Sequence, residues 1–405
     1  MEMRGGPLHG LRVVSFTSVA AGPVCAMMLA DFGAEVIKVE PPAGERSRAW
    51  GTGRFGKDGE FSSIFLAFNR NQSSVVIDLR TEDGRADAKR LLRTADVVIE
   101  NFTPGVAEEF GVGYRQAAAL RPDVVYCSIS GFGQDGPLRA RQGFDTMMQA
   151  YTGHLSITGE PNRPAVRIGP SAIDVLTGSN AAYGILVALY HRQATGEGQY
   201  LETSLYDNAL HLISHVIGDF TGTGELPGRW GPYYPYTAPY GIFKASDREL
   251  FIGVSAQFWP AFCAETGRQD LLADPRFRTN RDRLANRTSL YAELVPVIAR
   301  RPADEWVAAF SRAGIPASLV EDVAGVVAQE QALERNMIVD TGVDGVRTVG
   351  LPVKLHGSPG GIWRHAPSLG EDTERILGPL RGDDGQARLA SSRSKPRKVR
   401  QPSPP

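Results

Sequence analysis

From Leu11 to about Ile129 the chain alternates short apolar runs with helical stretches, a pattern typical of a parallel sheet covered by helices. Runs such as VVIDL and DVVIE are continuously apolar, as expected for strands that are buried on both faces. The pattern predicts strands at 12–16, 35–39, 73–79, 96–102 and 123–133, separated by helices at 23–32, 85–94 and 105–119. We therefore expect an α/β fold whose large domain is Rossmann-like and doubly wound.

The first strand–helix–strand unit, GLRVVSFTSVAAGPVCAMMLADFGAEVIKVEPP at residues 10–42, begins like a nucleotide-binding βαβ unit. Glu40 ends its second strand, at about the position of the acidic residue that binds a ribose in such units. The turn, however, reads TSVAAGP and lacks the glycines of G-x-G-x-x-G. The unit therefore suggests a nucleotide ligand but argues against an NAD dehydrogenase.

The middle of the chain predicts a second, smaller domain of the α+β class. Residues 174–193 are typical of one long helix, which ATGEGQ ends, and QYLETSL begins another strand. The stretch 222–241 is rich in Gly, Pro and Tyr and changes the composition sharply. Beyond it, ELFIGVS predicts a strand, residues 257–273, 281–301 and 303–313 predict helices, and VGLPVKL at 349–355 predicts a strand back in the first domain. The expected boundaries are 1–221 for the large domain, 222–330 for the small domain, 331–381 for the return and 382–405 for a disordered tail.

The charge balance favours neither nucleic acid nor a membrane as a partner. The 405 residues include 44 basic and 45 acidic side chains, for a net charge of -1. The tail holds six basic residues between Arg388 and Arg400, for which disorder is the expectation. The three cysteines are far apart in the sequence, as in proteins of a reducing compartment. With neither a signal-peptide pattern nor a run of 18 apolar residues, the expected location is the cytoplasm.

Local motifs alone leave the chemistry open. His211 and His215 have the i,i+4 spacing of a metal pair but no third ligand in view, which favours a structural role. GFGQDG lacks the Lys-Ser/Thr of a P-loop, and no G-x-S-x-G motif occurs. Asp174 stands near the start of the long helix, where a carboxylate is either an N-cap or a catalytic group. Local sequence favours the cap without deciding between them.

The segment RIGPSAIDVLTG…AAYGILVAL…ATGEGQYLETSL resembles the signature of the family III CoA-transferases. Further blocks resemble the family in order, among them LHGLRVVSFTSVAAGP, DFGAEVIKVEPP, ADVVIENFTPG, VVYCSISGFGQDGP and AGIPASLV. The resemblance extends from about Leu8 to Leu377. It implies an enzyme whose substrates are coenzyme A thioesters, with no permanently bound cofactor or metal. It also implies an interlocked homodimer and, from the run of its motifs, a small dicarboxylate as the acid.

The resemblance makes Asp174 the nucleophile, forming a mixed anhydride and then an aspartyl-CoA thioester. It implies that the turn after the first strand contacts CoA through its backbone and that other CoA contacts lie on three later blocks. The implied CoA-contacting residues are Ala20, Ala21, Lys38, Arg48, Ile77, Arg80, Asn101, Phe102, Thr103, Arg141 and Gln142. Arg80 and Arg141 suit the CoA phosphates. For Lys38, Arg48 and Arg70, a solvated surface charge is the alternative.

The chain also departs from the family pattern. Ala20 stands where the family often has Gln or Leu, which puts the acyl pocket in doubt. Glu109 stands where a basic residue is common, which puts one phosphate contact in doubt, and Gln72 replaces a frequent Lys. The stretch 222–241 has no glycine run like that of formyl-CoA transferase. A sister activity, α-methylacyl-CoA racemase, needs a His-Asp pair of bases where this chain has Phe144-Asp145, and is therefore disfavoured. A non-catalytic acyl-CoA-binding protein is the other alternative.

Overall fold

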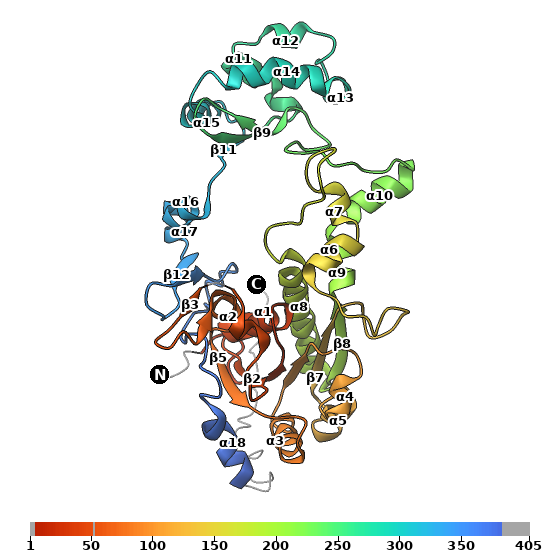
Figure 1. Cartoon of the computed structure of the whole chain (residues 1–405), viewed down its shortest axis with the longest axis vertical. Coiled ribbons are helices and arrows are strands. Elements are labelled where there is room, and N and C mark those ends of the chain that lie inside the picture. The colour runs from red at the N-terminus through yellow and green to blue at the C-terminus, as the bar shows by residue number, and fades with distance from the viewer. Residues whose placement is uncertain (1–4, 52, 383–405) are drawn as a thin grey trace, which may run out of the picture. The chain divides into compact units, whose positions relative to one another are not determined.

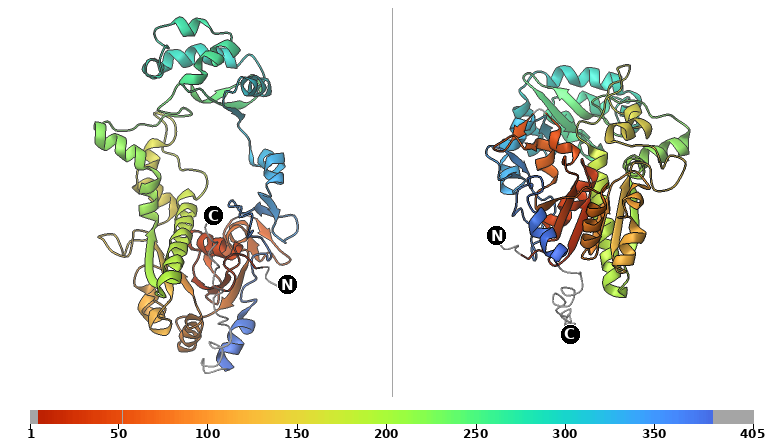
Figure 2. Two further views of the ribbon diagram at one scale, coloured as in Figure 1. Left: turned by 180° about the vertical axis from the view of Figure 1, so that it is seen from behind. Right: turned by 60° about the horizontal axis from the view of Figure 1, so that its bottom comes forward.

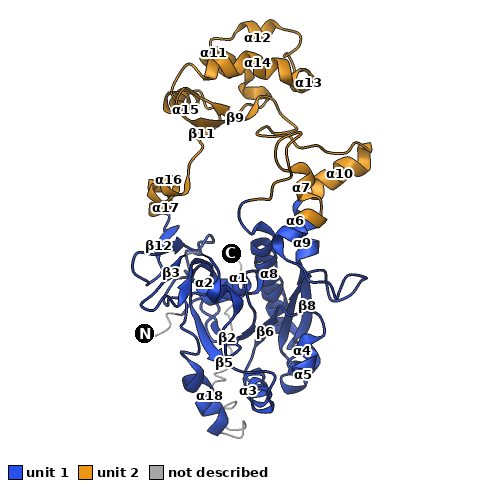
Figure 3. Ribbon diagram, viewed as in Figure 1, with its two compact units in different colours: residues 1–148, 169–212, 335–405 blue, residues 149–168, 213–334 orange. Residues whose placement is uncertain are grey.

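The computed structural model describes residues 5–51 and 53–382, so the predicted tail lies almost wholly outside the described residues. The chain forms two compact units (Figure 3). Unit 1 consists of residues 1–148, 169–212 and 335–405, and unit 2 of residues 149–168 and 213–334. Unit 2 thus includes residues 149–168, which were predicted to belong to the large domain. Its longer segment begins at residue 213, before the predicted boundary at 222.

Unit 1 is built on a six-stranded sheet in the order β5-β2-β1-β6-β7-β8 (Figure 1). All five neighbouring pairs are parallel. The chain therefore winds outward in one direction from β1 and then in the other from β6, as in doubly wound nucleotide-binding folds. The strands are β1 (Arg12–Phe16), β2 (Glu35–Glu40), β5 (Gln72–Val76), β6 (Val97–Glu100), β7 (Val125–Ser130) and β8 (Gln199–Ser204). The predicted α/β fold with a parallel central sheet is confirmed.

Helices cover both faces of this sheet. Because successive residues of a strand point to opposite faces, Val13 packs with Cys25 and Ile185 of one cluster and Val14 with Leu91 of another. The first cluster contains α1 (Ala21–Asp31) and α8 (Ala172–Thr195), and the second contains α3 (Glu82–Leu92), α5 (Tyr114–Leu120) and α18 (Thr373–Gly382). Unit 1 also contains η1 (Arg46–Ala49), α2 (Ser63–Phe68), α4 (Val106–Glu109), α9 (Leu205–Leu212) and the short strands β3 (Arg54–Phe55), β4 (Phe61–Ser62), β12 (Ile338–Asp340) and β13 (Arg347–Val349).

Helix α8 is the long helix predicted from the sequence, and it lies beside the sheet (Figure 2). Its small residues Gly178 and Ala181 are buried, and it packs against α1, β7 and β8. Among the described residues it is the one helix long and apolar enough to cross a membrane by length and composition. Core helices of soluble proteins pass the same test, and α8 contributes Ile173 and Ile185 to the core of unit 1.

Unit 2 has its own core around a three-stranded antiparallel sheet in the order β11-β10-β9. Trp306, Phe262 and Leu250 are among its fully buried side chains. Its strands are β9 (Tyr240–Lys244), β10 (Glu249–Gly253) and β11 (Ala317–Leu319). Its helices are α7 (His154–Ile157), α10 (Ser214–Thr223), η2 (Ala256–Phe258), α11 (Trp259–Glu265), α12 (Asp270–Ala273), α13 (Asn280–Ala285), α14 (Arg287–Ile298), α15 (Ala303–Arg312), α16 (Val323–Ala328) and α17 (Glu330–Glu334), and α6 (Asp145–Tyr151) runs into it from unit 1.

One predicted strand is wrong in its extent. VGLPVKL at 349–355 contributes only its first residue to a strand, β13, which pairs with β12 in a two-stranded ribbon of unit 1. Gly350 and Pro352 follow directly, and a proline has no N–H with which to extend the ladder.

Candidate active site

The β1–α1 turn, residues 17–20, lies at the carboxyl end of β1, where the strand order of the sheet reverses. Val19 has a φ of 73°, a left-handed backbone conformation that β-branched residues rarely adopt. Ala20 is the N-cap of α1 and supplies no side-chain hydrogen bond. The first N–H groups of α1 therefore have no side-chain cap, which leaves them available to an anionic or carbonyl oxygen.

Three side chains from other segments hold this turn. Asn101 accepts a hydrogen bond from the Ser18 N–H and donates one to the Ser18 carbonyl, both at 2.9 Å. The Val19 N–H donates to Glu45 Oε2 at 2.9 Å. Lys38 Nζ donates to the Thr17 carbonyl at 3.0 Å. Each of the three turn residues is thus fixed through its backbone.

Asp174 lies in the first turn of α8, but it is not the helix cap. The N-cap is Ser171, whose side chain makes no capping hydrogen bond. The cap is supplied by Asp145, whose Oδ2 accepts the N–H groups of Ile173 at 2.8 Å and of Asp174 at 3.2 Å. Among the described residues none donates a hydrogen bond to the Asp174 carboxylate. The alternative that local sequence left open is therefore settled against the cap.

The surroundings of Asp174 disfavour its charged form. Burial raises the pKa of Asp174 to about 7, and repulsion from the neighbouring Asp145 carboxylate adds to the rise. A carboxylate with this pKa is more basic than an ordinary aspartate, and at neutral pH a large share of it is still ionised. These are useful properties in a nucleophile.

A close approach between two helices brings Asp174 near the β1–α1 turn. A Cβ atom added at Gly178 would lie 2.5 Å from the carbonyl oxygen of Ala21, so only glycine permits this contact between α8 and α1. Asp174 and Gly178 are four residues apart on one face of α8, about 6 Å from each other. The carboxylate therefore lies within one helical turn of the point where α8 meets the start of α1.

The basic residues that stand at positions of the family pattern differ in accessibility from Arg80, which was predicted to contact a phosphate. Lys38 is fully buried, and Arg48 is buried in a pair with Glu40, 2.7 Å from Arg48 Nε to Glu40 Oε2. Arg70 is buried against Asp31 at 2.7 Å, so none of the three is a solvated surface charge. Arg80, in contrast, is exposed and pairs with Asp78 at 2.8 Å.

The remaining predicted residues lie beyond the carboxyl ends of three strands. Ile77 follows β5 and is buried, and Phe102 packs edge-on against Phe110 beyond β6. Thr103 is exposed, as are Arg141 and Gln142 in the loop after β7. Of the predicted set, the structure thus joins Asn101 and Lys38 to the β1–α1 turn by direct hydrogen bonds. Carboxyl ends of parallel strands meet at one edge of a sheet, the usual ligand edge in such folds.

Sequence reasoning missed the roles of two carboxylates, Glu45 and Asp145. Glu45 precedes η1 and accepts hydrogen bonds from Ser47, so a capping pattern in GERS was its only local signal. By sequence Asp145 stands at the position of a racemase base, and no local signal indicates that it caps a helix that begins 27 residues later. Among the described residues no cluster of three or more His, Cys, Asp or Glu side chains could hold a metal ion.

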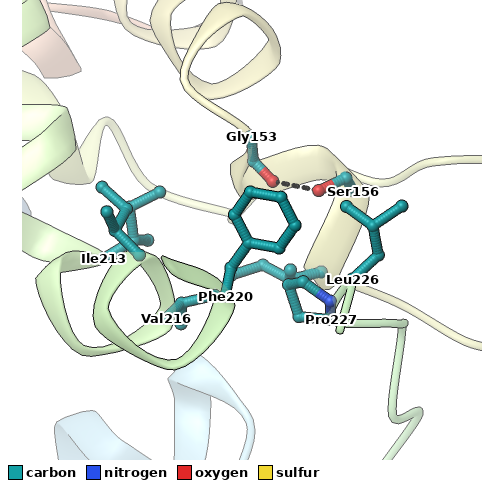
Figure 4. A pocket seen from close by; sticks show the side chains of 9 residues that line it. Gly153, Ser156, Ile213, Val216, Phe220, Leu226 and Pro227 are labelled. Atoms are coloured by element: carbon teal, nitrogen blue, oxygen red, sulfur yellow. Dashed lines mark hydrogen bonds between the residues drawn. The ribbon is translucent and has the colours of Figure 1, made fainter. Parts of the chain in front are cut away.

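Unit 2 contains a separate apolar pocket of about 340 Å³ between α7, α10 and the chain at 226–227 (Figure 4). Its polar element is Ser156, whose hydroxyl donates to the Gly153 carbonyl at 2.7 Å (Figure 4). The other lining residues are Ile157, Ile213, Val216, Ile217, Phe220, Leu226 and Pro227. No charged side chain lines it, so it suits neither a phosphate nor a carboxylate.

Comparison with known proteins identifies the family. The sequence model of CoA-transferase family III matches residues 8–373. The chain belongs to this family. The enzyme is therefore a CoA-transferase, as the resemblance implied.

Two relatives and one solved structure show how close the similarity is. The enzyme is 37% identical to the acetyl-CoA:oxalate CoA-transferase of Acetobacter aceti over 87% of this chain and 90% of the relative. It is 36% identical to the succinyl-CoA–D-citramalate CoA-transferase of Chloroflexus aurantiacus over 96% and 98% of the two chains. The crystal structure of a CAIB/BAIF family protein from Brucella suis superposes with a TM-score of 0.85 at 35% identity, covering 93% of this chain and all of that one.

Proposed function

We propose that this CoA-transferase moves CoA from succinyl-CoA to a small dicarboxylic acid, with Asp174 as the covalent nucleophile. The observation that carries the proposal is the Asp174 carboxylate. It lies at the start of α8 without a hydrogen-bond donor among the described residues, its capping function is taken over by Asp145, and its pKa is raised to about 7.

In the proposed reaction an Asp174 oxygen attacks the thioester carbon of the donor, and the C–S bond breaks. This gives a mixed anhydride and CoA thiolate. The thiolate then attacks the aspartyl carbonyl, releases the donor acid and forms an aspartyl-CoA thioester. The acceptor carboxylate attacks that thioester, breaks its C–S bond and forms a second mixed anhydride with Asp174. The released CoA thiolate then attacks the acceptor's acyl carbon, forms the acceptor thioester and frees the Asp174 carboxylate. Oxyanions that develop along this path are stabilised by nearby N–H dipoles, such as the uncapped ones at the start of α1.

CoA is proposed to lie along the β1–α1 turn, with its thioester toward Asp174. The uncapped N–H groups of α1 and the contact between Gly178 and Ala21 support this path. Phe102, Thr103 and Ile77 suit the apolar arm and the adenine, and the exposed cations Arg80 and Arg141 suit the phosphates. Lys38, Arg48 and Asn101 are buried or engaged with the protein itself, so their proposed contribution runs through the backbone that they hold.

The test of the donor and of the nucleophile needs no knowledge of the acceptor. Isotopically labelled succinate is incubated with succinyl-CoA, and label in the thioester is followed by mass spectrometry. We expect the wild type to exchange label and the Asp174→Asn and Asp174→Ala variants to lose at least about 10³-fold in rate, since the covalent step is removed. Hydroxylamine trapping should modify Asp174 in the wild type alone. Exchange by Asp174→Ala at the wild-type rate would contradict the mechanism.

A screen of carboxylic acids against succinyl-CoA and acetyl-CoA identifies the acceptor. The relative that uses D-citramalate supports a dicarboxylate acceptor and succinyl-CoA as donor. The relative that uses oxalate and acetyl-CoA makes that pair the necessary comparison. A preference for acetyl-CoA and oxalate would refute the proposed substrates but not the transferase chemistry.

Racemisation of a 2-methylacyl-CoA is the alternative reaction, and the site does not favour it. Phe144, at the position of the histidine base, is 51% exposed and has no titratable atom. Chiral chromatography of a 2-methylacyl-CoA incubated with the enzyme should show no loss of configuration.

We also propose a homodimer in which the outer face of α8 is covered by a second copy. Tyr183, Leu186, Val187 and Tyr190 have the i, i+3, i+4, i+7 spacing of one helix face, and Tyr183 and Tyr190 are 69% and 77% exposed. An apolar stripe of this kind is unusual on a monomer surface. Sedimentation should show a dimer for the wild type and for the exposed-loop control Lys57→Glu, and a lighter species for Val187→Glu. A wild-type monomer would contradict the proposal.

A further inference from the structure

The unusual backbone of the β1–α1 turn points to a residue with a role that its sequence context does not suggest. Val19 is held at a φ of 73°, in a region where a valine side chain is strained. Such conformations persist only where the surrounding structure fixes them, and they occur often at ligand sites. The question is which contact holds Val19 there.

Glu45 makes that contact from a rigid position. It is 5% exposed, and its Oε2 accepts both the Val19 N–H at 2.9 Å and the Ser47 N–H at 3.3 Å. Its Oε1 accepts the Ser47 hydroxyl. Its own N–H donates to Glu40 Oε2 at 3.1 Å, and Glu40 is fixed in turn by Arg48 and Ser74. The carboxylate therefore has little freedom to follow Val19 if the turn relaxes.

We propose that Glu45 is a positioning residue for the CoA thioester, acting through the backbone of Val19. By holding Val19 in the left-handed conformation, Glu45 fixes the direction of the N–H groups at Ala20 and Ala21. These groups begin α1, and Ala21 is the residue that Gly178 of the Asp174 helix approaches. The inference rests on the proposed function, because it assumes that CoA lies along this turn.

The other two side chains that hold the turn bond different residues, which supports the assignment of Glu45 to Val19. Asn101 holds both backbone groups of Ser18, and Lys38 holds the Thr17 carbonyl, but neither contacts the strained residue itself. Glu45 is the residue that bonds the Val19 N–H, so its loss should release Val19 in particular. A glycine at position 19 adopts a positive φ without steric cost and should need the clamp less.

The experiment is a double-mutant cycle of Glu45→Ala and Val19→Gly. The Kd of CoA is measured by titration calorimetry, and the KM of succinyl-CoA by the labelled-succinate exchange. In the wild-type background, Glu45→Ala should weaken CoA binding and raise the KM of succinyl-CoA by about tenfold, the order of the strain released. In the Val19→Gly background, the same change should cost no more than about threefold. Glu45→Gln keeps an oxygen that can accept the Val19 N–H, and should retain most of the affinity.

The outcomes separate the inference from the function on which it rests. If the wild type neither binds CoA nor exchanges label, the proposed function fails first. If the wild type is active but Glu45→Ala costs the same factor with valine and with glycine at position 19, Glu45 does not act through Val19. An unchanged CoA affinity in Glu45→Ala would overturn the inference as well. Melting temperatures of all variants show whether a loss of affinity merely follows a loss of folded protein.

Discussion

Replacing Asp174 by Asn should make the protein more stable while abolishing transfer. Burial and Asp145 raise the pKa of Asp174 from 3.8 to about 7, so the folded state binds a proton that the unfolded chain releases. Folding therefore carries a cost that is absent below about pH 4, grows as pH rises, and is complete above about pH 7. Asparagine has the same shape and no charge, and it removes this cost.

The size of the effect follows from the shift. At about pH 8.5 the full difference of about 3 between the folded and unfolded pKa of Asp174 applies. It corresponds to a cost to the free energy of folding of about 4 kcal/mol as an upper limit. At about pH 5.5 the folded group is still protonated, and the cost is only about 2 kcal/mol. The stability gained by Asp174→Asn should therefore increase by about 2 kcal/mol between these two pH values.

Guanidinium unfolding at both pH values, at one fixed protein concentration, measures this difference. Asp372→Asn is the matched control, because the pKa of Asp372 is shifted downward, opposite to that of Asp174. Although burial opposes its ionisation, hydrogen bonds from Arg364 and Arg375 hold the pKa of Asp372 below 3.8. The ionised Asp372 carboxylate stabilises the fold fully at any pH above its unfolded pKa. Asp372→Asn should therefore lower the free energy of unfolding by a similar amount at both pH values. If Asp174→Asn gains nothing at the higher pH, the carboxylate is not destabilised in the folded protein and the reasoning fails.

Three further predictions concern the same site. The rate of label exchange should fall as pH drops through about 7, because protonation of Asp174 removes the nucleophile. Asp145→Asn, which can still cap α8 but carries no charge, should move this pH midpoint downward; a midpoint that stays fixed would show that Asp145 does not act on Asp174. Gly178→Ala should destabilise the fold by about 1–3 kcal/mol and impair CoA binding, because its Cβ would meet the Ala21 carbonyl at 2.5 Å. In Gly184→Ala the added Cβ meets only the end of Leu201, so thermal melting should show little change or a gain; equal losses in both variants would contradict the close-approach argument.

The sheet of unit 1 could be predicted because its central strands contain apolar runs such as that of β6. Val97, Val98 and Ile99 are all fully buried, and such a run has few stable environments other than the middle of a covered parallel sheet. The unit boundaries were harder to predict. Residues 149–168 belong to unit 2 although their composition resembles their surroundings, since membership in a unit depends on packing partners distant in sequence.

The burial of charged residues at the site could not be predicted from the sequence. Lys38 and Arg48 could be solvated cations by sequence, yet both are buried, and burial lowers the pKa of Lys38. Buried cations are tolerable only beside acceptors and opposite charge, which here come from Glu40 and from the Thr17 carbonyl. Whether Asp174 caps α8 also depended on Asp145, a residue 29 positions away.

These contacts explain how a βαβ unit of the nucleotide-binding type forms its turn without the glycine fingerprint. In G-x-G-x-x-G turns, glycine lets the backbone adopt strained angles and approach a pyrophosphate. Here Val19 adopts the strained angle, and the turn is held in place because Glu45 accepts the Val19 N–H and Asn101 accepts the Ser18 N–H. Glycine is used instead at Gly178, where α8 must approach α1. The glycine that permits a close approach thus lies on the helix that carries Asp174 and not in the turn. This fits the proposed site, in which a thioester must reach a carboxylate and no pyrophosphate needs to lie against the turn.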